Sequence, residues 1–273
     1  MRGEFLDLSG ARLYYYAAGS RGAGDPVVLV HGFPTSSHLW NEVVPLLPVG
    51  HRIVVVDLLG YGRSDPPRDL DVSLAGHAHR LVGMFDMLGI RRACVVGHGI
   101  GGGIAQWLAV NETARVSHLC LVDSVAFDVW PRIEVRLARA MAPLLRHMPP
   151  GAILAALRSR LLAGYMDADR ARRSFDFYLR PFSTVEGRNA LIRQLSTLNH
   201  RETRELASRL GAIRLATAIV VGARDPFLPR SVGARLHAAI ARSTLHVASD
   251  ARHFTPEEAP TVVAAAVTEL LRR

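Results

Sequence analysis

The stretch VVGHGIGG at residues 95–102 decides how the rest of the chain is interpreted. A β-branched apolar run leads into it and predicts a strand over 93–99, and a helical pattern over 100–110 follows. Its four glycines permit a turn that is too tight for larger residues. At the end of a buried strand, such a turn predicts a place where a ligand or a reacting group meets the sheet.

Two interpretations of this turn compete. Gly97, Gly99 and Gly102 have the G-x-G-x-x-G spacing of a dinucleotide-binding turn, and Asp123 ends the next strand, where a ribose-binding acid is expected. In the other interpretation the turn is a nucleophile elbow, a sharp strand-to-helix turn that presents a reactive side chain between small neighbours. The nucleophile's position is then Gly99.

Short β-branched runs alternate with helical patterns on both sides of the turn. Strands are expected at 12–18, 27–32, 52–60, 93–99, 116–124, 217–225 and 244–249. Helices are expected at 36–47, 72–88, 100–110 and 258–272. This alternation predicts an α/β fold, with a mostly parallel, doubly wound sheet covered by helices on both faces.

Residues 128–208 show only helical periodicity, although they lie between two expected core strands. We therefore expect a core formed by 1–127 and 209–273, with 128–208 inserted as a helical cap over the carboxyl edge of the sheet. The segment 131–210 holds 15 arginines against 7 acidic residues. That excess indicates either a solvated helical surface or attraction of an anionic ligand, and the choice stays open.

The composition of the 273 residues excludes several kinds of chemistry and partner. The formal net charge is +9 and all 33 basic residues are arginine, so a lysine Schiff base and a Walker lysine are impossible. No recognition motif accompanies the arginines, and we expect no nucleic-acid partner. No apolar stretch approaches the ~20 residues that span a bilayer, so no membrane partner is expected.

Location and assembly are also expectations at this stage. The chain start lacks a basic stretch followed by an apolar one, so no signal peptide is expected. Cys94 and Cys120 lie in apolar runs and indicate buried free thiols in a reducing compartment. The prediction is a cytoplasmic protein with a small-molecule substrate, for which a homodimer is left open.

Three further motifs follow strands and decide between the two interpretations of the glycine turn. HGFP occupies 31–34, GARD occupies 222–225, and RHF occupies 252–254. With the glycine turn, they resemble the α/β-hydrolase fold family over essentially the whole chain. The resemblance is greatest to capped epoxide hydrolases, dehalogenases and related ester or C–C hydrolases. A dinucleotide-binding domain leaves these motifs unexplained, so the elbow interpretation is favoured.

The resemblance implies roles for five residues. His253 would be the general base, and Asp225 would orient it and stabilise its cation. The backbone N–H groups of Phe33 and Ile100 would form an oxyanion hole around Gly99. The chain order of elbow, acid and histidine also matches that of the family.

Other side chains are candidates for contact with the substrate, and each also has a structural interpretation. The tryptophans are equally well explained by core packing, and the histidine beside the elbow is more often structural. Epoxide hydrolases use cap tyrosines to donate hydrogen bonds to the epoxide oxygen, which the resemblance carries to two tyrosines here. The candidates are His31, Gly32, Trp40, His98, Trp130, Tyr165 and Tyr178. We expect no cofactor and no metal.

Glycine at 99 departs from the family, because it has no side chain to form a covalent intermediate. Ile100 stands where similar dehalogenases place a halide-binding tryptophan or an arginine, so dehalogenation is disfavoured. Four explanations remain for Gly99. His253 and Asp225 act directly as an acid–base pair in cyclisation, epoxide opening, a lyase step or an oxygenase step. Otherwise an epoxide or ester hydrolase is inactivated at its nucleophile, His253 holds a hydrolytic water, or the protein binds a ligand without catalysis.

Overall fold

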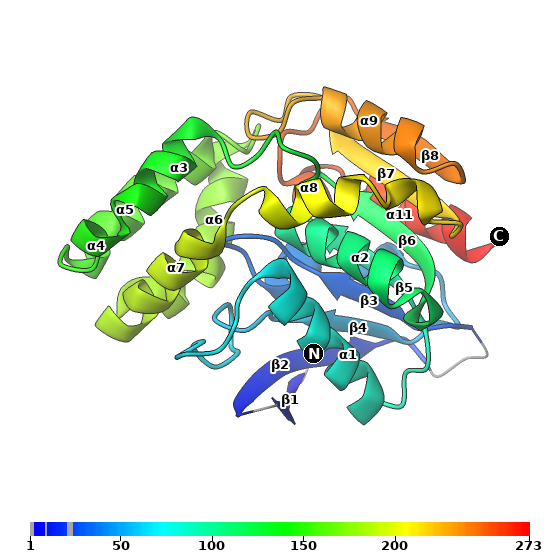
Figure 1. Ribbon diagram of the computed structural model, residues 1–273, viewed down its shortest axis with the longest axis horizontal. Coiled ribbons are helices and arrows are strands. Elements are labelled where there is room, and N and C mark those ends of the chain that lie inside the picture. The colour runs from blue at the N-terminus through cyan, green and yellow to red at the C-terminus, as the bar shows by residue number, and fades with distance from the viewer. Residues whose placement is uncertain (1–2, 9, 21–23) are drawn as a thin grey trace.

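A computed structural model describes residues 3–8, 10–20 and 24–273. Within these ranges eight strands form one sheet in the order β1-β2-β4-β3-β5-β6-β7-β8 (Figure 1). The first two strands pair antiparallel with their neighbours and the others run parallel. The strands are β1 Gly3–Leu8, β2 Ala11–Ala18, β3 Val27–Val30, β4 Ile53–Val56, β5 Ala93–His98, β6 Val116–Val122, β7 Thr217–Gly222 and β8 Ser243–Ala248.

Helices cover both faces of the sheet, which is why the central strands are apolar along their whole length. Every residue of β3, β4 and β5 is buried. In Figure 1, α1 and α2 lie in front of the sheet and α11 lies behind it. These helices of the α/β core are α1 Leu74–Met87, α2 Ile100–Asn111, α9 Ser231–Ala239, α10 Thr255–Glu258 and α11 Pro260–Leu271. The prediction of a mostly parallel, doubly wound sheet is confirmed.

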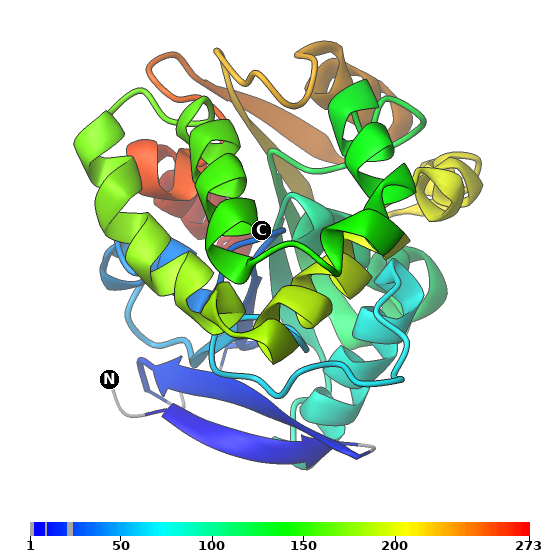
Figure 2. The same ribbon diagram turned by 90° about the vertical axis from the view of Figure 1, so that its left-hand side faces the viewer.

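The chain between β6 and β7 is helical. Figures 1 and 2 show α3 to α7 as a layer beyond one edge of the sheet, from which α8 returns toward it. The helices are α3 Ile133–Ala140, α4 Ala142–Leu145, α5 Pro150–Leu162, α6 Ala168–Leu179, α7 Val185–Thr197 and α8 Arg201–Ala207. The division of the chain into a core and a cap at 128 and 208 stays a prediction.

Three local expectations were wrong or incomplete. The helix expected at 36–47 is two 3-10 turns, Ser37–Trp40 and Val44–Leu46, because Pro45 has no N–H to continue a helix. The edge strand β1 was missed since its residues are mostly half-buried or exposed, which weakens the apolar pattern. Helix α9 was also missed. Further 3-10 turns lie at Thr113–Arg115, Arg180–Ser183 and Leu210–Ala212.

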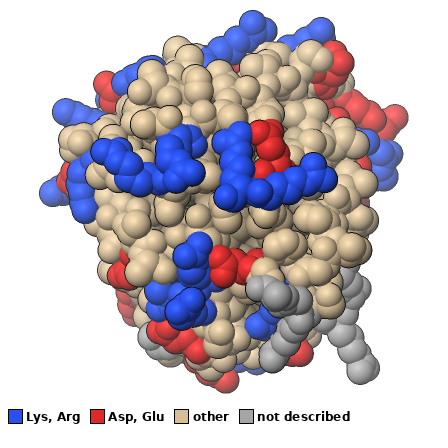
Figure 3. Space-filling view, turned by 90° about the vertical axis from the view of Figure 1, so that its right-hand side faces the viewer, with Lys and Arg blue, Asp and Glu red and all other residues tan. Residues whose placement is uncertain are grey.

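The positive charge is not confined to the helical layer. Figure 3 shows arginine side chains in a band across the face at the other end of the molecule from α3 to α7. Arginines directly precede several parallel strands, at Arg52, Arg92, Arg115 and Arg242. In the described part of the chain, no helix combines the length and the hydropathy that crossing a bilayer requires.

Candidate active site

The turn from β5 into α2 has the conformation of a strained elbow. Gly99 caps the helix with φ 56° and ψ −119°, a combination that L residues rarely adopt. The glycines around it are required because other backbone segments lie too close to leave room for a Cβ atom. A Cβ on Gly97 would collide with the carbonyl oxygen of Gly101, and a Cβ on Gly101 would collide with that of Val30. Gly99 is different, because a Cβ there would lie 3.6 Å from the Cα of Gly32, which is an ordinary van der Waals contact.

Two residues that line the cavity together with Gly99 have backbone N–H groups for which the described residues supply no acceptor. Phe33 and Ile100 both line the cavity beside it. Among the described residues, neither N–H donates to a protein acceptor. A Cβ on Gly32 would lie 2.9 Å from both Nδ1 and the carbonyl oxygen of His98, so glycine lets the Phe33 loop approach the elbow. The arrangement suits stabilisation of an oxyanion.

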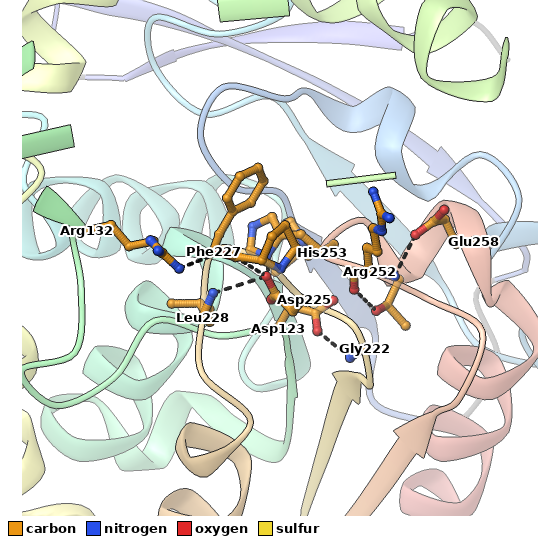
Figure 4. A network of polar contacts seen from close by, with 12 residues as sticks. Asp123, Arg132, Gly222, Asp225, Phe227, Leu228, Arg252, His253 and Glu258 are labelled. Carbon is orange, nitrogen blue, oxygen red and sulfur yellow. Dashed lines mark hydrogen bonds and ion pairs between the residues drawn. The ribbon is translucent and has the colours of Figure 1, made fainter. Parts of the chain in front are cut away.

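His253 and Asp225 form a hydrogen-bonded pair between the loops after β8 and β7. The Nδ1 of His253 lies 2.8 Å from Oδ2 of Asp225, and the side chains are 10% and 5% exposed (Figure 4). The other oxygen, Oδ1, accepts hydrogen bonds from the N–H groups of Phe227 at 2.7 Å and Leu228 at 3.1 Å. A carboxylate only accepts, so Nδ1 carries the proton. His253 lines the cavity, and its Nε2 is the nitrogen left for a substrate.

Each partner shifts the pKa of the other. Burial alone lowers the pKa of His253, but the charge and hydrogen bond of Asp225 raise it, and the net direction is upward. Burial alone raises the pKa of Asp225, and His253 together with the two backbone donors brings it below its ordinary value. The pair thus favours a cationic histidine beside an ionised carboxylate, which is the state that a general base reaches after it takes a proton.

Asp123 lies beneath this pair. Its Oδ1 accepts a hydrogen bond of 2.7 Å from the N–H of Gly222, and the residue is buried. Burial and the nearby Asp225 raise the pKa of Asp123 to about 7. Its contact with the Gly222 N–H links the ends of β6 and β7, in place of the ribose contact that a dinucleotide site would need.

The two other candidate histidines, His98 and His31, form hydrogen bonds with the backbone of loops around the site. His98 donates from Nε2 to the carbonyl oxygen of His253 at 2.9 Å, and burial lowers its pKa to about 3. His31 donates from Nδ1 to its neighbour Gly32 at 2.8 Å and accepts at Nε2 from the N–H of Leu58 at 3.0 Å. Neither histidine nor Gly32 is among the described residues that line the cavity. Their side chains or backbone hold the site's loops in place.

A cavity of about 360 Å³ separates the sheet from the helical layer. Its floor contains Phe33, Gly99, Ile100 and His253, and its roof comes from α3, α5 and α7. The lining is mostly aliphatic and aromatic. Three of its members carry full charges and come from the helical segment, and these are Arg132, Glu134 and Arg160. Such a lining is typical of sites that bind largely apolar organic molecules.

The aromatic candidates divide into one that lines the cavity and three that do not. Trp130 lines it, and its Nε1 donates to Oγ1 of Thr203 at 2.9 Å. Trp40 is fully buried in the core. Tyr165 and Tyr178 are buried behind the cavity wall, so the expectation that they meet a substrate is not supported by their position.

Instead, these tyrosines belong to a buried cluster that the sequence analysis missed. Tyr178 donates to Oε1 of Glu257, and Ser174 donates to its Oε2 at 2.9 Å. Tyr165 stacks on Phe254, next to the catalytic candidate, with ring centroids 4.2 Å apart. The cluster ties α6 to the loop of His253. No signal in a single sequence pairs residues so far apart.

The described ranges hold no cluster of potential metal ligands, and both cysteines are buried. No group of three or more His, Cys, Asp or Glu side chains there is arranged to hold a metal ion. Cys94 and Cys120 are free and buried on neighbouring strands. The polar groups found at the site are the imidazole of His253, the carboxylates of Asp225 and Asp123, and the backbone N–H groups of Phe33 and Ile100.

Comparison with known proteins agrees with this geometry. A family model described as alpha/beta hydrolase fold matches residues 25–260. The chain therefore belongs to the α/β-hydrolase fold family.

Individual relatives span nearly the whole chain. Haloalkane dehalogenase 2 of Mycobacterium tuberculosis is 28% identical over 280 residues, covering 97% of this chain and 93% of the relative. A putative carbamate hydrolase of Variovorax paradoxus is 29% identical, covering 82% of each chain. Among solved structures, an alpha/beta hydrolase fold protein from Burkholderia ambifaria has a TM-score of 0.86 and 29% identity, covering 98% of this chain and 100% of that one.

Proposed function

We propose that this protein is a cofactor-free enzyme that acts on a small, largely apolar organic molecule through His253 and Asp225, without a covalent nucleophile. One observation carries the proposal. The His253–Asp225 pair has the hydrogen bonds of a working general base, and the cavity floor beside it, at Gly99, is free of any side chain. Helices α3 to α7 act as a cap that keeps bulk water from the substrate.

The proposed mechanism consists of two proton transfers through His253. Nε2 of His253 takes a proton from the substrate or from a water molecule, and the carboxylate of Asp225 stabilises the imidazolium. Negative charge that develops on the substrate is stabilised by the N–H groups of Phe33 and Ile100. The imidazolium then returns the proton to the product. The space at Gly99 holds the water or substrate atom that a nucleophile would otherwise displace.

This mechanism covers two groups of reactions. With water as the proton donor it is a hydrolysis. With the substrate as the donor it is a cyclisation, an epoxide opening by an internal nucleophile, a lyase step, or an oxygenase step in which dioxygen oxidises the deprotonated substrate. In each case the base is the same nitrogen.

A second candidate function is favoured by a different observation. Gly99 keeps the φ and ψ of an elbow, and a Cβ has room there. An epoxide or ester hydrolase inactivated at its nucleophile would have this geometry. The names of the relatives, a haloalkane dehalogenase and a putative carbamate hydrolase, are consistent with hydrolytic ancestry.

Turnover of a panel of esters, epoxides and haloalkanes tests the proposal, with products followed by mass spectrometry so that isomerisation is also seen. His253→Ala is expected to lower any turnover by about 10²–10⁴-fold, the usual contribution of a general base. His147→Ala is the matched control, because that histidine is exposed and does not line the cavity. Activity that survives in His253→Ala would refute the proposal. If the unchanged protein shows no turnover and only Gly99→Asp or Gly99→Ser hydrolyses a substrate, the second candidate function is established instead.

A further inference from the structure

The charged side chains of the cavity lie together. Arg132, Glu134 and Arg160 line it from the segment around α3 and from α5. The remainder of the roof is apolar. The many other arginines of the chain do not line the cavity in the described ranges, and a band of them lies on the distant face (Figure 3). The high arginine content of the protein therefore does not explain why Arg132 and Arg160 line the cavity.

Glu134 lies between the two arginines and is held only loosely. Its Oε2 is 3.6 Å from Nε of Arg132, and its Oε1 is 3.6 Å from Nη2 of Arg160. Both distances exceed a hydrogen bond, and all three side chains are between 41% and 48% exposed. Exposed ion pairs of this kind contribute about 0–1 kcal/mol, so another carboxylate can replace Glu134 at little cost.

Both arginines contact the loop after β7, which carries Asp225. The guanidinium of Arg160 lies 5.1 Å from the ring centroid of Phe227, whose ring is in turn 5.0 Å from that of His253. Arg132 donates from Nη1 to the carbonyl oxygen of Pro226 at 2.6 Å. The ring of Phe227 thus separates Arg160 from the histidine, and Arg132 is hydrogen-bonded to the neighbouring residue of the same loop.

We propose that Arg160 and Arg132 bind the anionic end of an otherwise apolar substrate, a carboxylate or a group of the same shape. In the absence of a substrate, the carboxylate of Glu134 forms ion pairs with both guanidinium groups. Guanidinium groups bind carboxylates through two parallel hydrogen bonds, which fixes the direction of the bound molecule as well as its affinity. This inference rests on the proposed function for its claim that the cavity is the substrate site, and it names the class of substrate.

Calorimetric titration with octanoate and octan-1-ol tests the inference. The two probes share an alkyl chain and differ in the charge of one end. The unchanged protein is expected to bind octanoate about tenfold more tightly than the alcohol, and Arg160→Gln is expected to abolish that preference. Glu134→Gln is expected to strengthen octanoate binding several-fold and to leave the alcohol unchanged, because the competing carboxylate is removed.

Arg158→Gln is the matched control, since Arg158 lies on the same helix, pairs with Asp176 and does not line the cavity. It is expected to change neither affinity. Equal binding of the two probes, or binding of neither, would overturn the inference. So would a Glu134→Gln variant that binds both probes more tightly, because the three residues would then only close the cavity mouth.

The titrations need no turnover, which separates this inference from the proposed function. Charge-selective binding without any His253-dependent reaction would refute the proposed function alone. His253-dependent turnover of neutral substrates without charge-selective binding would refute this inference alone.

Discussion

A Cβ built on Gly99 lies 3.6 Å from the Cα of Gly32, and beyond its chain neighbours no other described atom comes within 4 Å. The other glycines of the same turn have no such space. The elbow is therefore crowded everywhere except at the position where a nucleophile would stand. A Cβ introduced there meets conformational strain but no steric obstacle.

Gly99→Asp and Gly99→Ser are expected to fold and to present their oxygens toward His253. If the second candidate function is correct, Gly99→Asp gains hydrolysis of epoxides and Gly99→Ser gains hydrolysis of esters. The positive φ is expected to cost about 1–3 kcal/mol of the free energy of unfolding. Thermal denaturation and product formation measure the two effects.

Gly89→Ser is the control for the strain. Gly89 has φ 64° and no atom within 4 Å of its Cβ position. Gly89→Ser is expected to lower the melting temperature by about as much as Gly99→Ser does, without changing activity. A Gly99→Ser variant that unfolds while Gly89→Ser stays folded would show that the space at the elbow is not usable.

The pH profile of turnover is expected to follow His253. The base must be neutral to take a proton, and its pKa is raised, so turnover is expected to rise with pH through a midpoint above the ordinary histidine value of about 6.5. Asp225→Asn removes the charge that raises this pKa. The variant is expected to lose about 10²–10⁴-fold in rate and to move the midpoint to lower pH. A midpoint that stays in place would mean that another group is titrating.

The stability of the protein is expected to depend on pH through Asp123. Its pKa is about 7 in the folded protein, above the ordinary value of about 4, so the folded state holds this proton more tightly than the unfolded state. The resulting stabilisation is complete below about pH 4 and is lost as pH rises through 7.

Asp123→Asn keeps the oxygen that accepts from Gly222 and removes the titration. Its melting temperature is expected to exceed that of the unchanged protein at pH 8 and to match it at pH 4, as measured by circular dichroism. The gain is bounded by about 4 kcal/mol, the full shift converted at 1.36 kcal/mol for each pH unit. Equal melting temperatures at pH 8 would contradict the assignment.

Tyr178→Phe is expected to destabilise the protein by about 1–3 kcal/mol, because Oε1 of the buried Glu257 loses its donor. Urea denaturation measures the effect. Tyr61→Phe is the control, since the Tyr61 hydroxyl is also buried but has no hydrogen-bond partner among the described residues. Its removal is expected to leave stability unchanged or higher. Equal losses in both variants would mean that the Glu257 contact contributes nothing specific.

Several features of this protein were determined by local sequence alone. The central strands could be predicted because each is apolar throughout, as a strand covered on both faces must be. The elbow could be predicted because only glycine fits at positions such as Gly97 and Gly101, where backbone atoms nearly touch. The resemblance to α/β hydrolases, carried by motifs in the sequence, implied that Asp225 and His253 form a pair, and the two side chains are hydrogen-bonded.

The remaining features depend on contacts between segments far apart in the chain. Tyr165 and Tyr178 were expected at a substrate because they lie in the helical segment, but their side chains contact Phe254 and Glu257 and do not line the cavity. Arg132 and Arg160 are two among many arginines in the sequence, and only the fold brings them to Pro226 and Phe227. Periodicity reports which face of an element is buried. It does not report which distant residue that face meets, and the tertiary structure alone decided that.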